Sequence, residues 1–134
     1  EHLKFLAPGF LYSVGMSAPL AAASQAALQC LQREPERAAA LQERGQFFLE
    51  HARAAGIDTA TSTGLAVIPA ITGSSIKAAR LSTALFERGI NVMPILYPAV
   101  PEKSARLRFF ISFQHTETMI AETIRAVAEE IKKL

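Results

Sequence analysis

The sequence predicts an open-faced α/β sandwich, in which helices cover a small sheet. Three observations lead to this fold class. The 134 residues suffice for about one domain, and half of them are apolar, as in a globular protein. The elements read from hydrophobic spacing follow the order helix, helix, strand, helix, strand, strand, helix.

The first third of the chain is expected to contain one long helix. Residues 1–16 lack a regular pattern, apart from a short strand at residues 10–12. A helix is predicted from Ser17, a suitable N-cap, to Gln32, with Pro19 in the first turn, where a missing N–H costs nothing. Because this helix is nearly uncharged, it is expected to be buried on more than one side, with Cys30 as a small buried hydrophobe.

A second helix and the first strand follow. Pro35 interrupts the helical pattern and opens a new helix, which Gly56 ends as a left-handed cap. The apolar run at residues 65–71 is typical of a strand. Pro69 lies inside this run and, because it has no N–H, predicts an edge strand or a bulge.

The remaining elements alternate more quickly. A third helix is predicted over residues 75–88, followed by strands at 90–96 and 106–112. Thr116 is expected to cap the last helix. Apolar residues in that helix step by four, three, four and three, which is a strongly amphipathic spacing: Ile120, Ile124, Val127, Ile131 and Leu134.

Composition excludes several functional classes. A net charge of +2, with no basic stripe interleaved with aromatics, argues against nucleic-acid binding. The longest weakly polar stretch is broken by prolines and glycines, so no membrane span is expected. One cysteine forms no internal disulfide, and the three histidines lack metal-ligand spacing. A start at Glu1-His2, without Met or a basic region, is interpreted as a cut within a longer chain and not as a signal peptide.

Two segments carry residues suited to anion binding. Arg106 and Arg108 are two apart in an apolar strand, so they share one face. A strand so apolar is expected to be mostly buried, and each buried guanidinium needs an anion, either an Asp or Glu of this chain or the carboxylate of a ligand. Residues 8–15, just before a helix, contain two glycines and Ser13; they suit a phosphate loop only weakly, and a plain turn is the favoured explanation.

Several motifs, in order, resemble one family. They are Phe10-Leu11-Tyr12-Ser13, Phe86-Glu87-Arg88-Gly89-Ile90, Tyr97-Pro98-Ala99-Val100-Pro101, Ala105-Arg106-Leu107-Arg108 and His115-Thr116. Together they resemble the C-terminal third of the α-oxoamine synthases, which include 8-amino-7-oxononanoate synthase and serine palmitoyltransferase. These are dimeric fold-type-I enzymes that use pyridoxal 5'-phosphate (PLP) to join an amino acid to an acyl thioester with loss of carbon dioxide.

The resemblance implies a role for each matching residue. Arg108 matches the arginine that binds the amino-acid carboxylate, and Ser13 matches a hydroxyl residue that reaches the cofactor phosphate of the neighbouring subunit. Tyr97 and Pro98 belong to a loop near the mouth of the active site. His115 matches a histidine that opens the last helix, for which capping or packing is favoured over catalysis. No catalytic or metal-binding residue is expected within this chain.

The resemblance also implies what lies elsewhere. The family's Schiff-base lysine precedes this segment, and none of the five lysines here has its Ser-x-x-Lys context. The isolated chain is therefore expected to be inactive and to bind no PLP by itself. Residues 1–32 are assigned to the end of the large domain and a long linking helix, and residues 33–134 to a two-layer α+β small domain with a mainly antiparallel sheet.

The implied partners are an amino acid, a thioester of coenzyme A or a carrier protein, and a second copy of the enzyme in the cytoplasm. Two alternatives stay open: a non-enzymatic α/β interaction domain, and the small domain of another fold-type-I aminotransferase. An interaction domain predicts that Arg108 pairs with an acidic residue of the same chain.

Overall fold

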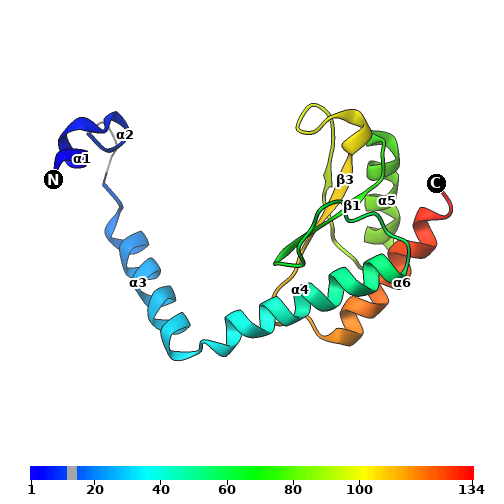
Figure 1. Cartoon of the computed structure of the whole chain (residues 1–134), viewed down its shortest axis with the longest axis horizontal. Coiled ribbons are helices and arrows are strands. Elements are labelled where there is room, and N and C mark those ends of the chain that lie inside the picture. The colour runs from blue at the N-terminus through cyan, green and yellow to red at the C-terminus, as the bar shows by residue number, and fades with distance from the viewer. Residues whose placement is uncertain (12–14) are drawn as a thin grey trace. The chain divides into compact units, whose positions relative to one another are not determined.

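The computed structural model describes the backbone of residues 1–11 and 15–134, and the side chains of residues 1–9 and 15–134. The chain divides into two compact units, Glu1–Pro35 and Glu36–Leu134 (Figure 1). The assignment of residues 1–32 to a large domain stays a prediction.

The first unit is helical in its described part. It contains α1 (His2–Leu6), α2 (Pro8–Leu11) and α3 (Ala18–Arg33). Ser17 is the N-cap residue of α3 and a proline lies in its first turn, as predicted. The strand expected at residues 10–12 is wrong for residues 10 and 11, which are helical, and Tyr12 lies outside the described residues.

The predicted burial of α3 is also wrong. None of its residues is buried, and Leu20 and Leu28 are 62% and 57% exposed. Cys30 is half-buried, and its thiol contacts the Glu34 carboxylate at 3.4 Å. A low-charge sequence indicates that a helix suits an apolar environment. A unit of 35 residues, in which no strand is described, offers too little apolar surface to cover the helix.

The second unit has the predicted order of elements. A short 3₁₀ turn, η1, precedes the last strand. The elements are α4 (Glu36–Ala54), β1 (Val67–Ile71), α5 (Ser75–Glu87), β2 (Pro94–Ile95), η1 (Glu102–Ser104), β3 (Arg106–Phe110) and α6 (Glu117–Ile131).

The sheet is antiparallel, with the order β1-β3-β2. β1 is an edge strand, as Pro69 predicted. The Ile111 N–H donates to the Ala66 carbonyl at 2.8 Å, and hydrogen-bonding positions alternate along an antiparallel pair. Pro69, which faces Arg108 in the register, therefore directs its ring nitrogen to the outer edge, where no partner strand needs an N–H.

The strand expected at residues 90–96 is reduced to Pro94–Ile95. The Ser82 hydroxyl on α5 donates to the Val92 carbonyl at 2.6 Å, so this carbonyl is bound to the helix and not to a neighbouring strand. The Arg108 N–H still reaches the Met93 carbonyl, at 3.4 Å. The residues of this segment that pair with β3 are Pro94 and Ile95.

The core lies on one face of the sheet, against α4, α5 and α6 (Figure 1). In β3, Leu107 and Phe109 are buried, whereas Arg108 and Phe110 are exposed. The two-layer sandwich is thus confirmed, with one covered and one open sheet face. The largest fully buried side chains are Ile68, Leu81, Leu85, Leu107 and Val127.

A glycine allows α4 to approach the segment before β1. A Cβ at Gly45 would lie 2.4 Å from the Gly64 carbonyl oxygen and 2.6 Å from that of Leu65. Gly45→Ala is expected to destabilise the fold by about 1–3 kcal/mol, because the clash outweighs the roughly 0.5–1 kcal/mol that alanine adds to a helix. Urea denaturation measures the difference, and Ala39→Gly, at an exposed position of α4, measures the helix-propensity effect alone. A stabilised Gly45→Ala variant would contradict the close approach.

Candidate functional site

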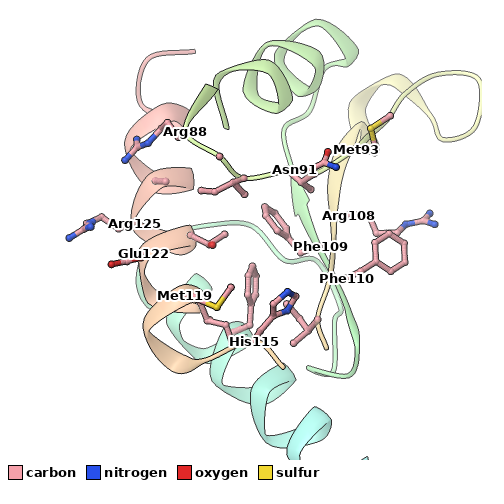
Figure 2. A pocket seen from close by; sticks show the side chains of 18 residues that line it. Arg88, Asn91, Met93, Arg108, Phe109, Phe110, His115, Met119, Glu122 and Arg125 are labelled. Atoms are coloured by element: carbon pink, nitrogen blue, oxygen red, sulfur yellow. The ribbon is translucent and has the colours of Figure 1, made fainter. Parts of the chain in front are cut away.

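A cavity of about 830 Å³ lies in the second unit, between β3, α6 and the segment that follows α5 (Figure 2). Its apolar wall includes Phe109 from β3 and Met119 from α6. Its polar lining includes Arg88, Arg108 and Arg125, together with Glu122, Asn91 and His115.

Arg108 lies at the margin of this cavity, on the open face of the sheet. Figure 2 shows the side chains of Arg108 and Phe110 on the side of β3 away from α6. The expectation of a buried Arg108 is wrong, because alternation along β3 buries Leu107 and Phe109 and leaves Arg108 exposed. An exposed guanidinium keeps its charge without an internal anion, so the open face is compatible with an unpaired arginine.

The two strand arginines differ in their partners. Arg106 is half-buried, and its Nε donates to the Ser104 carbonyl at 2.7 Å. Among the described residues, no carboxylate forms an ion pair with Arg108. The pairing with an acidic residue that an interaction domain predicts is therefore not found in the described part of the chain. Arg108 is left available to an external anion.

Arg88 has a different electrostatic environment. Its Nη1 lies 2.8 Å from Glu129 Oε2 and 3.0 Å from Glu130 Oε1. Hydrogen bonds to Glu129 and Glu130 raise the pKa of Arg88. The charge of Arg88 is thus compensated by these two carboxylates at one end of the cavity. Arg125 lies one turn before Glu129 in α6 and forms no ion pair with a described residue.

His115 has a structural role in the turn before α6. Its Nδ1 accepts the Ser112 N–H at 3.1 Å, and its carbonyl accepts from Arg44 Nε at 3.0 Å. The cap itself is Thr116, whose hydroxyl accepts the Met119 N–H at 3.2 Å, as predicted. Because an accepting Nδ1 places the proton of neutral imidazole on Nε2, the ring is held in one tautomer. These contacts support packing over catalysis for His115.

The predicted mouth loop lies apart from the cavity. Tyr97 and Pro98 are exposed, are joined by a cis peptide bond, and do not line the cavity that Arg108 borders. Their role near an active site stays a prediction. Ser13, predicted to reach a cofactor phosphate, lies outside the described residues, so its role also stays a prediction.

The lysines of this chain do not border the cavity. A Schiff base requires a lysine beside the cofactor. All five lysines are exposed, and none lines the cavity: Lys4, Lys77, Lys103, Lys132 and Lys133.

Among the described residues, no group of three or more His, Cys, Asp and Glu side chains is placed to hold a metal ion. No helix among them combines the length and apolar character needed to cross a bilayer.

Sequence reasoning missed part of the cavity lining. Met119, Glu122 and Arg125 are spaced by three residues, which places them along one side of α6. That spacing was a usable signal, but the stronger stripe of Ile120, Ile124 and Val127 marked only the buried side of the helix.

Known proteins with similar sequences span a much longer chain. The 8-amino-7-oxononanoate synthase of Bacillus pumilus is 33% identical over 134 residues, which are 100% of this chain and 34% of that protein. The chain thus spans about a third of the length of the curated relatives it matches.

Solved structures show the same fold. The 8-amino-7-oxononanoate synthase of Francisella tularensis matches with a TM-score of 0.81 and 23% identity, over 98% of this chain and 38% of that one. A structure of SPT with PLP matches with a TM-score of 0.85 and 16% identity, over 98% of this chain and 33% of that one. Both cover the described elements almost completely, which confirms the predicted fold-type-I architecture.

The family model for aminotransferase classes I and II matches residues 1–127. The resemblance to α-oxoamine synthases is confirmed by the synthases among the relatives and solved structures. This chain belongs to the aminotransferase class I and II family.

Proposed function

We propose that this chain is the C-terminal part of a PLP-dependent α-oxoamine synthase. The complete enzyme would be a cytoplasmic homodimer that condenses an amino acid with an acyl thioester, carried by coenzyme A or a carrier protein, and releases carbon dioxide. The names of its relatives support this reaction class. The lysine that holds PLP would come from the rest of the enzyme, so the 134-residue chain alone would be inactive.

The observation that carries the proposal is the Arg108 guanidinium on an open sheet face, with no ion-pair partner among the described residues. Guanidinium and carboxylate match in a two-point hydrogen-bonded fork. Arg108 would bind the carboxylate of the amino-acid substrate and fix the orientation of its α-carbon. Its position on β3 supports this role, because a paired central strand holds its side chains more rigidly than a loop.

The test uses the complete enzyme and the 134-residue chain side by side. A panel of small amino acids is supplied with acyl-CoA and acyl-carrier-protein thioesters, and release of free thiol and labelled carbon dioxide is measured. Borohydride reduction followed by peptide mass spectrometry locates the cofactor lysine. We expect coupled thiol and carbon dioxide release from the complete enzyme and none from the short chain.

The other outcomes identify the alternatives. Transfer of the amino group to a keto acid, without thiol release, would indicate another fold-type-I aminotransferase. A complete protein that binds no PLP and consumes no thioester would indicate a non-enzymatic domain. Turnover by the short chain would contradict its predicted inactivity.

A further inference from the structure

The connection between β2 and β3 crosses the N-terminus of α5. Its end is anchored at the Ala105 carbonyl, which accepts the Thr72 N–H at 2.9 Å, the Thr72 hydroxyl at 2.9 Å and the Gly73 N–H at 3.3 Å. The first half of the connection, residues 96–101, contains two prolines and thus has few backbone donors. Apart from the Pro101 carbonyl, which accepts the Ser104 N–H of η1 at 2.7 Å, its one described hydrogen bond to another element is donated by the Tyr97 N–H.

A carboxylate and a hydroxyl hold that N–H in place. Glu102 Oε1 accepts the Ser75 N–H at 2.7 Å, and Glu102 Oε2 accepts the Ser75 hydroxyl at 2.5 Å. The Ser75 hydroxyl in turn accepts the Tyr97 N–H at 3.2 Å. A serine hydroxyl has one proton, so donating it to Glu102 directs the oxygen lone pairs toward Tyr97.

Glu102 also supplies a cap that α5 otherwise lacks. Ser74 occupies the N-cap position, but its side chain makes no capping hydrogen bond. The carboxylate of Glu102 bonds to the first helical N–H instead, where a negative charge is favoured. Bonds from the Ser75 hydroxyl and the Ser75 N–H lower the pKa of Glu102, so the carboxylate stays ionised near neutral pH.

We propose that Glu102 and Ser75 are positioning residues for the Tyr97–Pro98 loop: Glu102 orients the Ser75 hydroxyl, which holds the Tyr97 backbone. This inference rests on the proposed function and on the prediction that the Tyr97–Pro98 loop lies near the mouth of the active site. Neither side chain contacts the substrate. Losing them would let the loop sample other positions and weaken substrate binding more than it slows turnover.

Two variants separate orientation of the hydroxyl from capping of the helix. Glu102→Gln keeps an oxygen that accepts the Ser75 N–H. It places an amide NH2 group, which cannot accept a hydrogen bond, beside the Ser75 hydroxyl. Ser75→Ala removes the hydroxyl altogether, and Ser75→Thr restores it. Glu87→Gln, at an exposed position near the other end of α5, is the matched control for loss of one carboxylate.

Mass spectrometry of the complete enzyme measures the rate of amide hydrogen exchange in the peptide that contains Tyr97. One hydrogen bond is worth about 0.5–1.5 kcal/mol, so exchange is expected to rise about two- to tenfold in Glu102→Gln and Ser75→Ala. Ser75→Thr and Glu87→Gln should match the parent. The KM for the amino acid should rise several-fold in the first two variants, with a smaller change in kcat.

Each contrary outcome has its own meaning. Unchanged exchange in both Glu102→Gln and Ser75→Ala would overturn the hold on Tyr97. Faster exchange with an unchanged KM would overturn the positioning role, because the loop would then be held without affecting the substrate. If the parent enzyme consumes no thioester, the proposed function fails, while the exchange comparison still decides whether Glu102 and Ser75 hold Tyr97.

Discussion

Arg108→Ala in the complete enzyme is expected to lower kcat/KM for the amino acid by about 30- to 4000-fold. Removing one partner of a hydrogen-bonded charge pair costs about 2–5 kcal/mol, and each 1.4 kcal/mol is a factor of ten. Because a carboxylate bound before the reaction contributes to ground-state binding, much of the loss should appear as a raised KM. Steady-state kinetics over a range of amino-acid concentrations measures both parameters.

A conservative variant separates charge from geometry. Arg108→Lys keeps the positive charge but loses the planar fork, so it should recover part of the activity and not all of it. Arg80→Ala, an exposed arginine on α5 that lies outside the cavity, is the control for loss of one charge. Normal kinetics in Arg108→Ala would show that another group binds the carboxylate.

Leu107→Ala is expected to destabilise the chain by about 2–5 kcal/mol. Leu107 is 0% exposed on the covered face of β3, and truncation there removes packing and leaves a cavity. Urea denaturation of the chain measures the loss. Ile76→Ala, at a position 66% exposed on α5, should change stability by no more than about 0.5 kcal/mol. Equal effects of the two substitutions would contradict the assignment of the core face.

Neighbouring residues of β3 thus have different roles. Leu107 faces the helices and stabilises the unit, while Arg108 faces outward and is free to bind an anion. A substitution of Leu107 should leave anion binding nearly unchanged, and a substitution of Arg108 should leave stability nearly unchanged. This separation is a direct result of the two-residue period of a strand.

The sequence was most informative where the signal was local. Thr116 and the apolar steps after it located α6, and Pro69 identified β1 as an edge strand. It failed where a distant group decides the structure. The Ser82 hydroxyl binds the Val92 carbonyl, a contact between residues ten apart that no local pattern reveals, and only Pro94–Ile95 of the expected strand is paired.

Burial was harder to predict than secondary structure. Ala-rich, uncharged α3 was expected to be buried, but apolar composition does not say whether the covering surface belongs to the same segment of chain. The arginine pair in β3 was correctly placed on one face by its spacing. The apolar residues around Arg108 concealed the alternation that leaves it exposed. Arg88 and Arg125 were not recognised as residues that line the cavity.

The proline in β1 also limits how the sheet can associate. Three residues of this strand direct their backbone nitrogens to the outer edge: Val67, Pro69 and Ile71. Pro69 has no hydrogen to donate, and the Ile71 N–H is already bound to the Asp58 carbonyl at 2.8 Å. Among these three, only Val67 offers a free donor, so an aggregating strand from another molecule cannot form a continuous ladder there. The fold thereby protects the β1 edge of the sheet from amyloid-like growth.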